Sequence, residues 1–87
     1  MYYVYVLEEV NLGKLYIGYS SDLRSRIKAH HAKKVTSTRH GDYQLIYYES
    51  YLNKAYALGR EKFLKGGSGR RYINKQLRHY FDDSNRV

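Results

Sequence analysis

The alternation of apolar and polar positions near the N-terminus predicts a β-hairpin. Residues 2–7 and 15–19 are rich in β-branched and aromatic side chains, and a polar stretch separates the two runs. Successive side chains of a strand point to opposite faces of a sheet. A turn centred near residues 10 and 11 would therefore bring Tyr5 of the first strand almost opposite Tyr16 of the second.

A helical pattern follows the hairpin. Residues from about 22 to 32 have apolar positions at helical spacing, with Leu23 and Ile27 on the inward face. Ser20 or Ser21 is expected to cap this helix, because a serine hydroxyl accepts a hydrogen bond from the free N–H groups of the first turn.

The second half of the chain predicts one more strand and two more helices. After a polar, basic loop, residues 43–51 return to strand composition. Residues 53–65 have helical spacing, and the sequence GGSG at 66–69 is expected to break the chain before a last helix at 70–81. The side chains expected to face inward on that helix are Ile73, Leu77 and either Tyr80 or Phe81.

These elements together predict a small α+β (α/β) domain of order β-β-α-β-α-α, in which helices flank a three-stranded antiparallel sheet. A chain of 87 residues can bury one modest core. Residues 1–87 are therefore expected to form a single domain.

The net charge of the chain predicts a kind of binding partner. The chain has 16 Lys and Arg against 8 Asp and Glu, a formal charge of +8, and it contains 12 tyrosines. A positive field favours a polyanion, and aromatic rings among cations favour nucleic acid, since rings stack on bases while cations meet phosphates. The alternative is a basic surface without a partner.

The residue types that the chain lacks exclude some kinds of site and of location. Without cysteine the chain forms no disulfide and no thiolate zinc site, so a metal would need oxygen or imidazole ligands. The first residues lack a basic leader with a small-residue cleavage site, and their apolar run is too short to span a bilayer. These features predict a cytoplasmic protein with no membrane partner.

Three polar side chains stand where packing alone does not require them. Arg26 and His30 lie one helical turn apart and border the inward face of the first predicted helix. Glu61 lies on an apolar stripe of the second helix, where a carboxylate is costly unless it is paired or binds a metal. A structural ion pair, with Arg26 or with a neighbour of Arg60, is the open alternative for Glu61.

The order of these residues resembles the GIY-YIG nuclease superfamily, and within it the small single-domain members similar to the N-terminal domain of excinuclease C. The chain departs from the first signature triplet at one position, where Tyr3 replaces the glycine. The matching residues, in chain order, are YVY at 3–5 and YIG at 16–18, followed by Arg26, His30 and Glu61.

The resemblance implies hydrolysis of phosphodiester bonds in DNA with one Mg²⁺ or Mn²⁺. In this interpretation Tyr5 accepts a proton from the attacking water, and Tyr16 holds the water or a phosphate oxygen. Arg26 binds the phosphate through its planar fork of donors. His30 is a proton donor or hydrogen-bond partner near the same phosphate, or alternatively a plain surface histidine. Glu61 binds the metal, with water molecules as its other ligands.

Other residues are candidates for substrate binding. Gly18 would let the backbone approach the phosphate. Asn74 lies roughly where several members of the superfamily keep an asparagine. The tyrosines on or beside the third strand, at 43, 47, 48, 51 and 56, are expected to be half-buried core residues. The cations that would follow a DNA backbone, each of which is alternatively only solvated, are Arg24, Lys28, Lys33, Lys34, Arg39, Arg70 and Arg71.

The sequence therefore predicts a metal-dependent DNA endonuclease, structure-selective and linked to DNA repair or recombination, with a protein partner as a source of specificity. One alternative is a nucleic-acid-binding module that keeps the scaffold without catalysis or depends on a partner for it. Another is a structural or protein-interaction domain, which would show no salt-sensitive binding to DNA.

Overall fold

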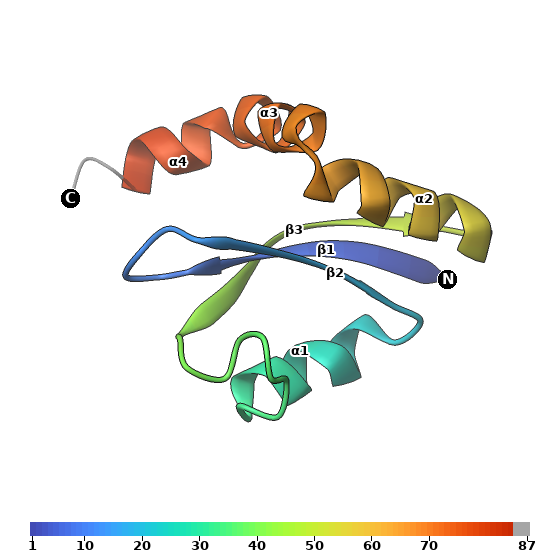
Figure 1. The fold of residues 1–87 in the computed structure, drawn as a ribbon, viewed down its shortest axis with the longest axis horizontal. Helices are drawn as coiled ribbons and strands as arrows, with labels where there is room; N and C mark the ends of the chain where they lie inside the picture. Colours follow the sequence, from blue (N-terminus) through green and yellow to red (C-terminus); the bar gives the residue numbers. More distant parts are fainter. Residues whose placement is uncertain (85–87) are drawn as a thin grey trace.

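The computed structural model describes residues 1–84. They form three layers, with the sheet in the middle and helices on both sides (Figure 1). The sheet is three-stranded and antiparallel, as predicted, and its strand order is β2-β1-β3. Its strands are β1 (Tyr2–Glu9), β2 (Leu15–Ser20) and β3 (Tyr43–Tyr51). The helices are α1 (Leu23–His31), α2 (Lys54–Lys65), α3 (Gly67–Gln76) and α4 (Arg78–Ser84). The predicted α+β class is thus confirmed, and residues 85–87 of the expected domain lie outside the described residues.

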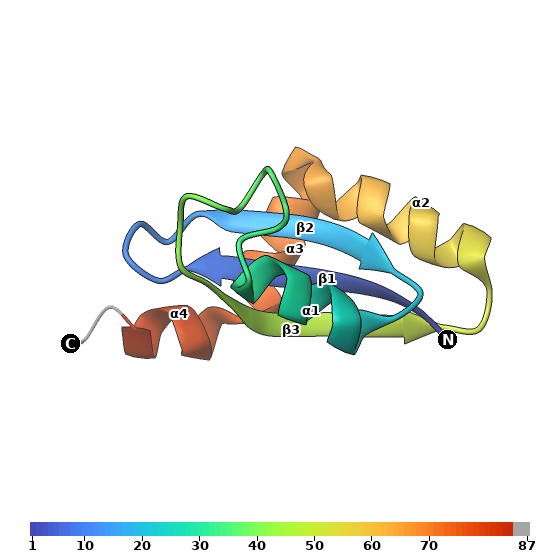
Figure 2. The same ribbon diagram turned by 90° about the horizontal axis from the view of Figure 1, so that it is seen from below.

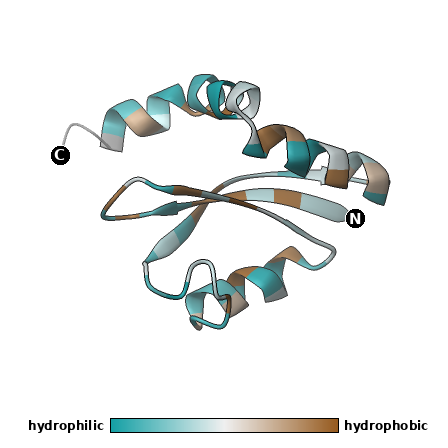
Figure 3. Cartoon of the chain, in the orientation of Figure 1, coloured by the Kyte–Doolittle hydropathy of each residue, from teal (hydrophilic) through white to brown (hydrophobic). Residues whose placement is uncertain are grey.

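The two faces of the sheet are covered differently. Helices α2, α3 and α4 lie on one side, while α1 and the loop that follows it cover the other (Figures 1 and 2). Figure 3 shows that α3 and α4 are mostly hydrophilic, with few hydrophobic positions. Among residues 1–84, no helix combines the length and the hydropathy that crossing a membrane requires.

The hydrophobic core lies between the sheet and helices α2 and α3. Val4 and Val6 of the central strand β1 are fully buried there, as strand alternation requires. They pack against Ala57, Leu64 and Ile73, which are also buried. Because this core fills one face of the sheet, the side chains on the other face of β1 are available for a different purpose.

The hairpin register differs from the predicted one. Tyr5 pairs with Gly18, and Tyr16 pairs with Leu7, so the expected near-opposition of the two tyrosines was wrong by two residues. A shift of two residues keeps every side chain on its face, because the side-chain period of a strand is two. Tyr5 and Tyr16 are therefore diagonal neighbours on the α1 face.

A longer turn explains the register. The carboxylate of Glu9 accepts hydrogen bonds from the backbone N–H groups of Asn11 and Leu12, both at 2.9 Å. Gly13 then adopts a φ of 70°, a left-handed conformation that favours glycine. This turn moves the centre of the hairpin toward the second strand, which residue spacing alone did not reveal.

The N-cap of α1 also differs from the prediction. Neither Ser20 nor Ser21 caps the helix; instead the Asp22 carboxylate accepts a hydrogen bond of 3.2 Å from the backbone N–H of Ser25. Ser20 acts one step earlier, because its hydroxyl accepts from the N–H of Asp22 at 2.9 Å. Aspartate is as good a cap as serine, so composition could not choose between them.

The glycine-rich segment is a helix crossing and not a linker. The expected break at 66–69 is confirmed only at Gly66, which separates α2 from α3, because α3 already begins at Gly67. A Cβ on Gly69 would lie 2.2 Å from the carbonyl oxygen of Phe63, so the glycine lets two helices meet backbone to backbone. The predicted single helix at 70–81 is likewise divided, because α3 ends at Gln76 and α4 begins at Arg78.

Candidate active site

Three aromatic rings meet on the α1 face of the sheet. Tyr5 from β1 and Tyr16 from β2 have ring centroids 6.3 Å apart, and His30 from α1 lies over both. Its ring centroid is 5.6 Å from that of Tyr5 and 5.2 Å from that of Tyr16, in edge-to-face geometry. The structure therefore brings together three of the predicted catalytic residues from three different elements.

Both ring nitrogens of His30 are engaged in hydrogen bonds. Nε2 lies 2.8 Å from the Tyr5 hydroxyl, and Nδ1 lies 2.7 Å from Oγ1 of Thr38. All three residues are buried, with exposed fractions of 0% for Tyr5, 3% for His30 and 2% for Thr38. The alternative of a surface histidine was wrong. Sequence reasoning missed Thr38, because a threonine in a polar loop carries no signal of burial.

The burial of Tyr5 fixes the direction of these hydrogen bonds. Among the described residues, His30 is the one side chain in hydrogen-bonding geometry with the Tyr5 hydroxyl, while the Arg26 guanidinium lies near enough to influence the pKa of that hydroxyl. The Tyr5 proton then points to Nε2 of His30, since the opposite arrangement would leave a buried hydroxyl proton without a partner. It follows that Nδ1 of His30 carries the imidazole proton and donates to Thr38.

The electrostatic environment keeps both buried groups neutral at pH 7. Burial raises the pKa of Tyr5, and the nearby guanidinium of Arg26 opposes this shift. Burial lowers the pKa of His30, and the positive charges of Arg26 and His31 add to the effect. The nearby Tyr5 in turn raises the pKa of Arg26. A neutral tyrosine thus faces a neutral histidine that can take its proton.

Gly18 makes room for Tyr5. A Cβ at this position would lie 2.3 Å from both Cζ and the hydroxyl oxygen of Tyr5, well inside van der Waals contact. The tyrosine ring therefore occupies the space that any larger residue at 18 would need. This packing role was not foreseen, and the approach of the Gly18 backbone to a phosphate stays a prediction.

Glu61 pairs with a residue that sequence reasoning did not consider. Its carboxylate forms an ion pair of 3.0 Å with Lys65, one turn later on α2, and not with Arg26. The side chain is 21% exposed and lies close enough to Tyr5 to contribute to its raised pKa. An ordinary structural partner thus exists for Glu61, as the alternative interpretation required, although the partner is a different one.

The donor set near the tyrosines fits a hard divalent cation only in a water-rich form. Within residues 1–84, no three His, Cys, Asp or Glu side chains come together in a way that could hold a metal ion. Glu61 would therefore be the single protein ligand, and Lys65 would have to release it. Mg²⁺ keeps several water ligands in many protein sites, so one carboxylate is compatible with its chemistry.

A groove of about 360 Å³ runs along the edge strand β2 beside this cluster. Tyr16 lines it from the strand, and Ser37 lines it from the loop after α1. Lys65 and Arg70 line it from α2 and α3. Of the predicted backbone-binding cations, Arg70 is thus the one that lies in the groove of Tyr16, and Lys65 was missed.

The other predicted cations are spread over the surface. Lys33 pairs with Asp42 at 3.0 Å and donates to the carbonyl of Gly41. Several of the rest lie apart from the Tyr16 groove. Arg39 donates to His40, Arg71 donates to Ser68, Lys34 and Asn74 are exposed, and Arg24 and Lys28 flank α1 on the β3 side.

The tyrosines of the third strand divide into two groups. Tyr43, Tyr47 and Tyr51 are half-buried, as predicted. Tyr48 is 53% exposed and Tyr56 is 69% exposed, so the prediction of half-buried core residues was wrong for these two. Tyr48 lies on the edge strand β3, on the α1 face of the sheet, and lines an open groove beside α1.

The chain is similar in sequence to a known protein family and to a known protein. Residues 1–76 match the family model of the GIY-YIG catalytic domain. The chain is also similar to UPF0213 protein CPE1444 of Clostridium perfringens (strain 13 / Type A), with 40% identity over 68 residues, or 75% of this chain and 71% of that protein. No solved structure matches the chain. All predicted site residues lie within the residues matched by the family model.

Proposed function

We propose, since the chain belongs to the GIY-YIG catalytic domain family of the nuclease superfamily, that it is a metal-dependent endonuclease that hydrolyses phosphodiester bonds in DNA. The observation that carries this proposal is the chain of contacts from exposed Arg26 through buried Tyr5 to His30. A buried histidine that holds a tyrosine proton beside an arginine suits general-base chemistry at a phosphate better than packing alone.

Arg26 and Tyr16 are the groups that a phosphate can reach. Arg26 is exposed and Tyr16 is half-buried in the β2 groove, whereas Tyr5 lies behind them. We expect the scissile phosphate to contact the Arg26 fork and the Tyr16 hydroxyl. Lys65 and Arg70, in the same groove, suit the neighbouring phosphates of the strand.

The buried pair supplies a path for the proton of the attacking water. The Tyr5 hydroxyl donates its proton to His30, so the lone pairs of its oxygen can accept a proton from the water. Tyr5 can then pass its own proton to Nε2 of His30. No free phenolate is needed, although burial raises the pKa of the tyrosine.

Glu61 would hold Mg²⁺ or Mn²⁺, which supplies positive charge to stabilise the negative charge that develops on the phosphate oxygens. The support is the carboxylate itself, close to Tyr5 and partly exposed. In the free protein Lys65 neutralises this carboxylate. Metal and lysine therefore compete for the same oxygens.

Resemblance to the N-terminal domain of excinuclease C supports a role in DNA repair or recombination. The proposed contacts of the site go to phosphates, which carry no sequence information directly, so we expect specificity to come from DNA shape or from a protein partner.

The test is cleavage of labelled linear and branched DNAs with Mg²⁺, Mn²⁺ or EDTA. Glu61→Gln and Arg26→Ala should abolish metal-dependent cutting while the proteins still bind DNA. Lys75→Ala is the matched control, because it removes one exposed positive charge of α3 away from the cluster, and it should cut like the wild type. Salt-sensitive binding without cleavage by the wild type would favour the binding-module alternative. An absence of salt-sensitive binding would favour a structural domain.

A further inference from the structure

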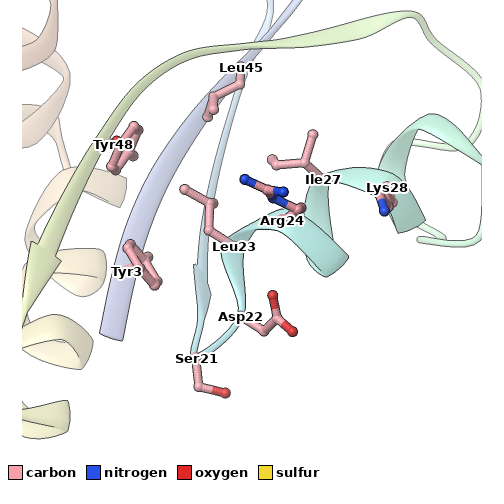
Figure 4. A pocket seen from close by; sticks show the side chains of 9 residues that line it. All are labelled: Tyr3, Ser21, Asp22, Leu23, Arg24, Ile27, Lys28, Leu45 and Tyr48. Atoms are coloured by element: carbon pink, nitrogen blue, oxygen red, sulfur yellow. The ribbon is translucent and has the colours of Figure 1, made fainter. Parts of the chain in front are cut away.

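A second groove, of about 580 Å³, lies on the same face of the sheet but on the β3 side of α1 (Figure 4). The strand order β2-β1-β3 puts it across the sheet from the Tyr16 groove. Helix α1 joins the two sites, because its residues Arg24 and Lys28 line this groove and its His30 belongs to the catalytic cluster. A strand of nucleic acid bound at the catalytic cluster could therefore reach it.

Two tyrosine rings form an open aromatic surface in this groove. The centroids of Tyr3 and Tyr48 are 6.2 Å apart, with the planes inclined at 63°. Tyr48 is 53% exposed, and Leu45 beside it is 36% exposed. Large apolar side chains that share one hollow and remain open to solvent usually mark a binding site. Tyr3 stands where the signature triplet has glycine, so this position contributes a ring to the groove.

Two cationic side chains lie beside the aromatic surface. Arg24 and Lys28 line the groove from α1, and in Figure 4 the Arg24 guanidinium reaches over it toward Leu45. The single carboxylate of the lining, Asp22, is occupied by the backbone N–H and hydroxyl of Ser25. The groove therefore combines flat apolar rings with two cations, which matches a base attached to phosphate and not a purely apolar peptide.

We propose that this groove binds an unpaired base of the nucleic-acid substrate, with Tyr48 stacking on the base, Tyr3 meeting its edge, and Arg24 and Lys28 contacting its phosphates. A paired base inside a duplex cannot present its face to a tyrosine, so the groove selects DNA with a single-stranded segment next to the cleavage site. The substrate class rests on the proposed function, whereas the binding itself does not require cleavage.

The test measures binding in EDTA, where cleavage cannot contribute. Fluorescence anisotropy compares a labelled single-stranded oligonucleotide with a blunt duplex of the same sequence. Tyr48→Ala should weaken binding of the single strand about tenfold, because the base loses its stacking partner, and should leave duplex binding unchanged. Tyr48→Phe keeps the ring and should bind like the wild type.

Tyr56→Ala is the matched control, since Tyr56 is 69% exposed on α2 at the opposite face of the sheet. It should bind both DNAs like the wild type, and all variants should retain the wild-type melting temperature. If Tyr48→Ala weakens the binding of both DNAs equally, or weakens neither, the groove proposal is overturned. This holds even if the wild type cuts duplex DNA with Mg²⁺. Failure of the wild type to bind either DNA would overturn the proposed function as well.

Discussion

Oγ1 of Thr38 lies 2.7 Å from Nδ1 of His30, and both side chains are buried. This contact ties the polar loop between α1 and β3 to the catalytic cluster. Nδ1 carries the imidazole proton and donates to the Thr38 hydroxyl, because the other nitrogen accepts the Tyr5 proton. The loop therefore helps to hold His30 in place, in addition to carrying exposed cations.

Thr38→Val should lower the stability of the protein and change the tautomer balance of the His30 ring. The variant keeps the shape of the side chain but leaves the buried Nδ1–H without an acceptor, which costs about 1–3 kcal/mol in the free energy of unfolding. Urea denaturation measures this loss, and ¹⁵N NMR of the histidine ring should show a shifted tautomer balance. Thr38→Ser retains the hydroxyl and should restore the wild-type ring signals. Unchanged signals in Thr38→Val would contradict the assignment.

Gly18→Ala should displace Tyr5, because the added Cβ would lie 2.3 Å from the tyrosine hydroxyl oxygen. We expect a loss of about 1–3 kcal/mol in unfolding free energy, typical of overpacking, together with a loss of cleavage. The control is Gly59→Ala on α2, where nothing lies within 4 Å of an added Cβ. That change should stabilise the protein by about 0.5–1 kcal/mol, because alanine favours a helix. Equal effects of the two substitutions would refute the packing role.

The lowered pKa of His30 predicts a pH dependence of stability. Below about pH 6.5 the unfolded chain binds a proton on this histidine that the folded protein resists. The free energy of unfolding should therefore fall as pH drops from about 6.5 toward the folded pKa, by at most about 1.4 kcal/mol per pH unit for one proton. Urea denaturation of the wild type and His30→Gln between pH 5 and 8 checks this. The variant should show a flatter profile, and identical profiles would count against the assignment.

A half-buried charge cluster holds α2 on the sheet. Glu49 accepts hydrogen bonds from Tyr47 and Tyr51, both at 2.6 Å, and from Arg60 at 2.8 Å and 3.0 Å. The Arg60 guanidinium also lies 4.4 Å from the ring centroid of Tyr72. Burial alone would raise the pKa of Glu49, but the hydrogen bonds from Arg60 and the tyrosines outweigh it and lower the pKa.

Glu49→Gln should therefore destabilise the protein by about 3 kcal/mol, because it removes the charge that four donors share and leaves Arg60 without its partner. The carboxylate contributes fully above about pH 4.5, and its contribution is lost as pH falls through the lowered pKa. Thermal or urea unfolding at pH 7 and pH 3.5 should show the difference shrinking in acid. Asp42→Asn, which breaks the exposed pair with Lys33, should cost less than about 1 kcal/mol.

The sequence by itself determined the three strands, the first two helices and their order. Alternation put Val4 and Val6 on one face of the sheet and Tyr5 on the other, because a strand's side chains alternate whatever surrounds it. The two tyrosine triplets and the spacing of Arg26 and His30 likewise indicated the family and the catalytic cluster.

Only the tertiary structure decided how these residues meet. The hairpin register followed from the contacts of the Glu9 carboxylate with its turn, and the choice of Lys65 for Glu61 followed from side-chain geometry on α2. Thr38 joined the site because the chain returns to His30 after a loop of eight residues. Tyr48 stayed open to solvent because it lines the open groove beside α1 on the edge strand β3. These outcomes depend on long-range distances, which local periodicity does not encode.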